Sequence, residues 1–361
     1  MTAISQQSSS TKLDQRRVDA LAEAMTDEVG AALGCALVVV GDRLGIYKAL
    51  AAGGPISPEG LAAQLGLSER MMREWLMNQA AGRYVSYDGE TGRYYLSPEQ
   101  AAILADESSP SFLCGAFQFA TAMIKAEERI GEVFRTGQGM RWGEHHGDLF
   151  PGLARFSRPI YTHKLCDVFI PAVEGLSERL TAGALVADIG CGHGYSTMLM
   201  AERFTASRFV GFDNHPDSIA QATRIAAERG LGDRVRFEVA EATSFPPRSY
   251  DVIAFFNCMH DVGHADACAA HCLTALRSDG CVFMVEPIGG DRVEDNFNAA
   301  GRLMTGASVL CCTPHGMIDG GAALGTVVAD ARIDQIMRNA GFRSFRRVMS
   351  TRFNRVFEAR P

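Results

Sequence analysis

The stretch from Leu185 to Thr197 carries the residues whose types and spacing predict chemistry most directly. An apolar run there is followed by Asp188 and then by glycines at alternate positions, Gly190, Gly192 and Gly194. Glycines between a buried strand and a helix start predict a tight turn that a ligand can approach closely, because no Cβ stands in the way. The G-x-G-x-G spacing differs from the dinucleotide fingerprint and from the glycine-lysine phosphate cradle. The acid before the turn favours a ligand that carries an amino group.

Polar side chains follow each of the later β-rich segments. From Leu180 onward, apolar segments alternate with helical patterns, which is typical of a doubly wound parallel sheet. Asp213 ends the second segment, Glu241 follows the third, His260 follows the fourth and Glu286 ends the fifth. Ligands of such sheets bind along the carboxyl edge, so we expect these residues to converge on one crevice, where Asp213 can accept both ribose hydroxyls of an adenosine.

On the glycine turn and on Asp213, the chain resembles the class I S-adenosylmethionine-dependent methyltransferases. The resemblance implies an α/β fold with a Rossmann-like seven-stranded sheet that ends in an antiparallel hairpin. It also implies S-adenosylmethionine as methyl donor, S-adenosylhomocysteine as product, and no metal. Glu241 stands where that family usually has Asp near the adenine amino group. We therefore assign to cofactor binding Asp188, Gly190, Gly192, Gly194, Asp213, Asn214, Glu241, Ala242 and Asn257.

The residues that follow the fourth segment resemble a catalytic pair. His260-Asp261 is similar to the His-Asp pair of plant-type small-molecule O-methyltransferases, whose histidine is the base for a hydroxyl acceptor. The resemblance implies His260 as base and Glu286 as its orienting partner, with His264 as a weaker candidate. Two alternatives stay open. His260 can be a helix-capping or cofactor-packing residue, and some family members methylate nitrogen or sulfur by proximity alone, with no base.

The N-terminal part predicts a winged helix. Ser57 and Ser68 are good N-cap residues for helices over residues 58–65 and 69–81, and an Asp-Gly turn separates two β-rich segments that follow. The second helix carries as many acids as bases, and the whole chain has a net charge of −7. Because DNA readers need a basic face, this favours a dimerisation or substrate-covering role without nucleic acid. The alternative is a transcriptional regulator that senses S-adenosylmethionine. The chain is similar to bacterial winged-helix-fused methyltransferases.

The order of these features predicts four regions. We expect a disordered tail over residues 1–12, a winged-helix and dimerisation domain over 13–105, a helical linker over 106–180, and the methyltransferase domain over 181–361. No secretory signal precedes them, and the longest apolar run near the start is too short to span a bilayer. The ten cysteines are scattered, which suits reduced thiols. These features predict a cytoplasmic protein with no membrane partner, and the resemblance implies a homodimer through the N-terminal domain.

Three further patterns bear on the substrate. About forty residues separate Glu286 from the next helix, and their apolar residues predict an insert that packs over the crevice and shapes a pocket for a small apolar or aromatic acceptor. A four-residue spacing that begins at His260 and ends at Cys272 would extend about 18 Å along one helix, too far for a zinc site. The vicinal thiols Cys311 and Cys312 are compatible with arsenic methylation or, more simply, with two buried thiols.

Overall fold

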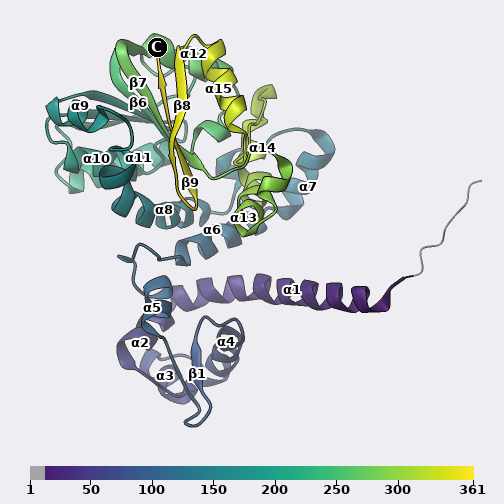
Figure 1. The fold of residues 1–361 in the computed structure, drawn as a ribbon. Coiled ribbons are helices and arrows are strands. Elements are labelled where there is room, and N and C mark those ends of the chain that lie inside the picture. The colour runs from purple at the N-terminus through teal and green to yellow at the C-terminus, as the bar shows by residue number, and fades with distance from the viewer. Residues whose placement is uncertain (1–12) are drawn as a thin grey trace, which may run out of the picture. The chain divides into compact units, whose positions relative to one another are not determined.

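The computed structural model describes residues 13–361, and the chain divides into two compact units (Figure 1). One unit ends at Ala105 and the other spans Asp106–Pro361. The tail predicted over residues 1–12 lies outside the described residues. The segment predicted as a linker, residues 106–180, belongs to the second unit.

The first unit is a winged helix, as predicted. Ser57 and Ser68 cap two of its helices by accepting the backbone N–H groups of Gly60 and Met71. The first two helices are separated at Gly45, which adopts a φ of +70°. Its elements are α1 (Gln15–Arg43), α2 (Ile46–Gly53), α3 (Pro58–Leu65), α4 (Glu69–Ala81), β1 (Ser86–Asp88), β2 (Arg93–Tyr95) and α5 (Pro98–Leu104).

Helix α1 carries an exposed apolar stripe. It is the one helix among residues 13–361 that is long and apolar enough to cross a membrane by length and composition, and 22% of its most apolar window is buried. Side chains at intervals of three, four and seven residues share one face of a helix. The exposed apolar side chains of α1 follow such intervals: Val18, Leu21, Met25, Val29, Leu33 and Val40.

The second unit is built on a seven-stranded sheet in the order β5-β4-β3-β6-β7-β9-β8. The first five strands in that order are parallel, and β9 and β8 run antiparallel at one end. This is the methyltransferase sheet predicted from the sequence. Its strands are β3 (Leu185–Ile189), β4 (Arg208–Asp213), β5 (Val235–Val239), β6 (Tyr250–Phe256), β7 (Leu276–Pro287), β8 (Ser344–Ser350) and β9 (Asn354–Arg360).

Alternate residues of each central strand enter two hydrophobic clusters, one on each face of the sheet. Val186 of β3 packs with α10 (Tyr195–Arg203) and α11 (Pro216–Glu228), whereas the next residue, Ala187, packs with α12 (Ala265–Ala275) and α15 (Asp330–Asn339). The strands are therefore covered on both faces, which explains why they read as continuous apolar runs in the sequence.

Helical segments before and after the sheet complete the second unit. Before it lie α6 (Cys114–Ile124), α7 (Glu127–Thr136), α8 (Leu149–Ile160), a π-helical segment (Tyr161–Phe169) and α9 (Leu176–Ala182). After β7, the insert folds into α13 (Ala299–Ala307), a second π-helical segment (Ser308–Cys312) and α14 (Thr313–Gly316).

The segment after β6 differs from the sequence prediction. We expected His260, His264, Cys268 and Cys272 to share one helix, but α12 begins only at Ala265, and His260 lies in a separate 3₁₀ turn, Met259–Asp261. The chain bends between them because the backbone of Gly263 packs closely against the insert. A Cβ at Gly263 would stand 2.7 Å from the carbonyl oxygen of Gly316.

Candidate active site

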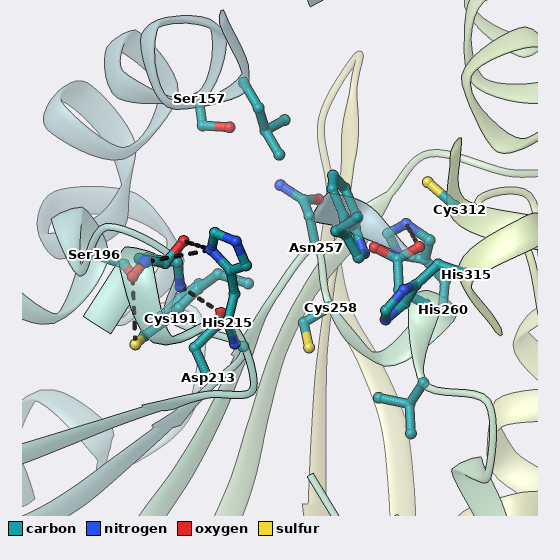
Figure 2. Close-up of a pocket in the computed structure, with 18 of the residues that line it drawn as sticks. Ser157, Cys191, Ser196, Asp213, His215, Asn257, Cys258, His260, Cys312 and His315 are labelled. Carbon is teal, nitrogen blue, oxygen red and sulfur yellow. Dashed lines mark hydrogen bonds and ion pairs between the residues drawn. The ribbon is translucent and has the colours of Figure 1, made fainter. Parts of the chain in front are cut away.

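A cavity of about 360 Å³ lies at the carboxyl ends of the parallel strands (Figure 2). Asp213 and His215 lie at one side in this view, His260 and Cys312 at the other, and Asn257 and Cys258 between them. Most of the predicted site residues line the cavity: Gly190, Gly192, Asp213, Asn214, Glu241, Ala242, Asn257, His260 and His264. Asp188, Gly194 and Glu286 are not among its lining residues.

The glycine turn after β3 brings backbone to the cavity wall. Gly190, Gly192 and Gly194 all have positive φ angles, +69°, +53° and +71°. A Cβ at Gly190 would lie 2.2 Å from the Cys258 sulfur, and one at Gly194 would lie 2.3 Å from the ring of Phe237. A Cβ at Gly192 would meet nothing within 4 Å, although this residue lines the cavity. The turn therefore forms a cradle in which a ligand can reach the backbone.

Asp188 lies in β3, just before this turn. Its Oδ2 accepts hydrogen bonds from the hydroxyls of Ser196 and Thr197, at 2.8 and 2.6 Å, which join the end of β3 to the start of α10. Its Oδ1 is buried without a hydrogen-bond partner. Burial raises the pKa of Asp188 from 3.8 to about 7, and the two hydroxyl hydrogen bonds only partly oppose that rise.

Asp213 is held rigidly at the end of β4. Its Oδ2 accepts the backbone N–H of Gly192 at 2.8 Å, and its Oδ1 accepts that of His215 at 2.9 Å. Each carboxylate oxygen keeps a further lone pair for a ligand. Nearby, the amide of Asn214 donates to Glu241 Oε2 at 3.2 Å, so these two residues form one polar corner of the wall.

His260 is coupled to a buried carboxylate. Its Nδ1 lies 2.5 Å from Glu286 Oε2, and Oε1 of Glu286 accepts the backbone N–H groups of Cys258 and Met259 at 3.2 and 2.9 Å. Burial alone lowers the pKa of His260. The carboxylates of Asp261 and Glu286, with hydrogen bonds to Cys312 and Glu286, outweigh it and raise that pKa well above 6.5. The ring is therefore a stronger base than free imidazole, and Nδ1–H is oriented toward Glu286.

Aromatic side chains form much of the remaining wall. Phe150 stacks on His215 with a centroid distance of 4.6 Å, and the Asn257 amide donates to the Tyr161 hydroxyl at 2.7 Å. Burial raises the pKa of Tyr161, so its hydroxyl stays protonated. The aromatic lining residues are Phe119, Trp142, Phe150, Phe156, Tyr161, Tyr195, Phe256 and Phe353.

The insert after β7 supplies another part of the wall. Met304, Ala307, Cys312, His315 and Thr326 all line the cavity. Other apolar residues of the insert do not contribute, and one of them, Phe297, is 79% exposed.

His315 is the insert residue that meets the aromatic wall. It contacts Trp142 edge-on at a centroid distance of 5.8 Å. Its Nδ1 is buried without a hydrogen-bond partner. Burial, followed by the charges of Arg141 and His145, lowers the pKa of His315 to about 4. This imidazole is therefore neutral at physiological pH and presents one donor and one acceptor.

Comparison with known proteins decides the class of the second unit. A family model described as a methyltransferase domain matches residues 180–341. The chain carries a methyltransferase domain. A second family model, described as an Rv2258c-like winged HTH domain, matches residues 31–106.

Curated relatives match parts of this chain. Trans-aconitate 2-methyltransferase of Streptomyces avermitilis is 41% identical over 71 residues, which are 19% of this chain and 26% of that protein. Methyltransferase ungE' of Aspergillus campestris is 28% identical over 134 residues, or 36% of this chain and 38% of that protein. The matches thus span about a quarter to two-fifths of these relatives.

Solved structures share the fold over nearly the whole of this chain. Human N-acetylserotonin methyltransferase, solved in complex with SAM, has a TM-score of 0.66 and 16% identity and covers 97% of this chain and 99% of its own. An O-methyltransferase family protein from Burkholderia thailandensis has a TM-score of 0.68 and 17% identity and covers 95% and 97%. The mitomycin 7-O-methyltransferase MmcR has a TM-score of 0.66 and 17% identity and covers 96% and 100%.

Several lining residues of the methyltransferase domain were not assigned a role from the sequence. Phe150, His215 and His315 line the cavity, yet none belongs to a motif with a recognisable spacing. His193 lies within the glycine turn and Cys312 in the vicinal thiol pair, but neither was assigned a role in the cavity. The insert was expected to shape the pocket, and that expectation pointed toward the region of Cys312 and His315. The Phe150–His215 stack joins residues 65 positions apart and has no local sequence signal.

The raised pKa of Asp188 predicts how stability depends on pH. Its pKa lies near 7 in the folded protein and near 3.8 when exposed, so the folded state holds the proton more tightly between those values. The contribution of Asp188 to the free energy of unfolding is therefore fully present below about pH 4. It falls by about 4 kcal/mol as the pH rises through 7. Urea unfolding at about pH 5 and pH 8 should show a smaller loss in Asp188→Asn than in the wild type. Equal losses in both proteins would contradict the assignment.

Proposed function

We propose that the protein transfers a methyl group from S-adenosylmethionine to a hydroxyl of a small apolar or aromatic molecule. One observation carries the proposal: a glycine cradle with an anchored acid and a carboxylate-held histidine face the same cavity. The first pair suits an adenosyl ligand, and the second suits removal of a proton from the acceptor.

The residues at the glycine end fit the methyl donor. The open space beside Gly192 allows a ligand to hydrogen-bond the backbone there. Asp213, already fixed by two N–H donors, would accept the ribose hydroxyls without reorganising. The polar corner of Asn214 and Glu241 would recognise the adenine edge, as the sequence resemblance implies. Asp188 would contribute indirectly, because its hydrogen bonds hold the glycine turn against the start of α10.

The residues at the other end would manage the proton of the acceptor. When bound, the donor supplies an electrophilic methyl group that an oxygen nucleophile can attack. In its neutral form, His260 would accept the acceptor's hydroxyl proton at Nε2, because Nδ1 is committed to Glu286. Glu286 holds the ring in this tautomer and stabilises the resulting imidazolium. His264, which also lines the cavity, has no comparable buried partner among the hydrogen bonds of the described residues.

The wall of the cavity supports an aromatic acceptor. Flat side chains such as Trp142, Phe156 and Phe256 offer ring faces and edges on which a planar molecule can pack. The neutral His315 would hydrogen-bond an uncharged oxygen more readily than it would pair with a carboxylate, because burial holds it uncharged. Methylation of nitrogen or sulfur would use the same wall but would not need His260.

The winged helix is proposed as a dimerisation element without a role in DNA binding. On α4, Arg70 pairs with Glu74, and Arg73 pairs with both Glu69 and Glu59, so its arginines are already neutralised. The apolar stripe of α1 would instead be covered by a second copy of this chain. A regulator that binds DNA would need a basic face that α4 lacks.

We also propose that the protein works in the cytoplasm. All ten cysteines are free, and most are buried. Free thiols in such number suit a reducing compartment.

The donor site can be tested by binding. Asp213→Ala should weaken S-adenosylmethionine and S-adenosylhomocysteine binding by about 100-fold, because two charge-assisted hydrogen bonds to the ribose are lost. Titration calorimetry measures this directly. Asp217→Ala is the matched control, since Asp217 is an exposed acid four residues away on α11. Asp213→Asn keeps the shape and should bind with intermediate strength. Wild-type affinity in Asp213→Ala would overturn the assignment.

The base can be tested once labelled donor has identified an acceptor in a panel of phenols and other small hydroxyl compounds. His260→Ala should lower kcat by roughly 10²- to 10⁴-fold while S-adenosylhomocysteine still binds, since proton removal is lost and the donor end is intact. Glu286→Gln should lower kcat in the same direction. His264→Ala serves as control and should stay close to wild type. Near wild-type turnover by His260→Ala across pH would favour methylation by proximity.

The dimer can be tested on α1. Leu21→Glu combined with Met25→Glu places charges in the apolar stripe, so the protein should change from dimer to monomer in sedimentation equilibrium. The control is Glu23→Lys on the same helix, which should remain dimeric. A monomeric wild type, or co-sedimentation of the wild type with phospholipid vesicles, would contradict the proposal and assign the stripe another partner.

A further inference from the structure

Three ligand-type side chains converge at the histidine end of the cavity. His260, Asp261 and Cys312 place an imidazole nitrogen, a carboxylate oxygen and a thiol sulfur all within 4.8 Å of one another. The closest pair, His260 Nε2 and Asp261 Oδ1, is 3.1 Å apart. Nitrogen, oxygen and sulfur ligands around one tetrahedral Zn²⁺ lie about 3.3 to 3.7 Å from each other, so small side-chain rotations suffice to enclose an ion.

The surroundings of the cluster match those of a metal site. His260 already directs Nδ1 to Glu286, which leaves Nε2 as the ligand atom, and a carboxylate behind a histidine is the usual outer support of a zinc ligand. Asp261 Oδ1 is buried without a hydrogen-bond partner, although it faces Nε2. A cation between them would satisfy this oxygen. All three residues line the cavity, so an ion can enter from it.

We propose that His260, Asp261 and Cys312 form a binding site for a thiophilic divalent cation, Zn²⁺ in particular, that inhibits the protein. The ion is not a cofactor for methyl transfer. It takes the Nε2 lone pair that the proposed base needs, so the bound and the active states exclude each other. Binding replaces the Cys312 thiol proton, which leaves to solvent, by a sulfur–metal bond. The inhibitory part rests on the proposed function, whereas the ion site stands on the geometry alone.

The ion site is tested by binding to the full-length protein after treatment with a chelator. Zn²⁺ titration by calorimetry should give one ion per chain. Cys312→Ser should weaken that binding by about 100-fold or more, since it removes a direct ligand. Cys311→Ser is the matched control, because this neighbouring thiol is equally buried and lies outside the cluster. Asp261→Asn provides a second variant if Cys312→Ser does not fold.

Co²⁺ provides a spectroscopic signal that depends on direct coordination by Cys312 and that would not change if Cys312 had only a structural role. The wild type and Cys311→Ser should show a thiolate-to-cobalt charge-transfer band and intense tetrahedral d–d bands, and Cys312→Ser should lack the charge-transfer band. Zn²⁺ binding that survives in Cys312→Ser, or the absence of a thiolate band in the wild type, would overturn the site.

Inhibition is read as the ratio of methyl transfer with and without Zn²⁺. That ratio should fall in the wild type and stay near one in Cys312→Ser, and activation by Zn²⁺ would overturn the inhibitory role. S-adenosylmethionine titration separates the two proposals. Heat for the donor without heat for Zn²⁺ contradicts only the ion site, and heat for Zn²⁺ without heat for the donor contradicts only the methyl-transfer proposal.

Discussion

The histidine end of the cavity depends on one buried carboxylate. Glu286, one residue before the end of β7, has no exposed surface, and a charge in that position would cost several kcal/mol if it were unpaired. Three donors satisfy it: the backbone N–H groups of Cys258 and Met259, and the imidazole of His260. All three come from the loop after β6, so the carboxylate ties that loop to the neighbouring strand. The position of His260 follows from this requirement.

A second carboxylate plays the same part at the other end. Asp213 ends β4 and holds the N–H of Gly192, which belongs to the turn after the adjacent strand β3. In both places an acid at the tip of one strand fixes the loop of its neighbour. Parallel pairing of β4, β3, β6 and β7 sets these tips along a single edge, so two separate local interactions build the two ends of one cavity.

The geometry of the glycine end could be predicted from the sequence because its determinants are local. Gly190, Gly192 and Gly194 need positive φ angles, and this need is visible in the residue types themselves. The strands were also predictable, since burial on both faces leaves continuous apolar runs. The N-caps Ser57 and Ser68 were equally local. Element ends were less well predicted: β7 begins at Leu276, before the apolar run that marks the strand in the sequence, and the three residues after Leu276 are exposed and polar.

The acceptor end could not be predicted in the same way, because distant segments create it. Trp142 and His315 meet across 173 positions, and Cys312 reaches His260 only because the insert packs against the loop after β6. The single helix that we expected to carry both His260 and Cys272 does not form, for the same reason. The backbone at Gly263 packs closely against Gly316 of the insert, and the local sequence pattern gives no sign of this contact.

The two π-helical segments show how the fold aims side chains at this end. Tyr161 begins one segment and Cys312 ends the other, and both line the cavity. A π-helix widens the turn by one residue and so rotates the following side chains relative to an ordinary helix. Such segments are unfavourable on their own, so packing around them must compensate. Because both segments contribute to the cavity wall, we expect selectivity for the acceptor to depend more on these helical segments than on the sheet edge.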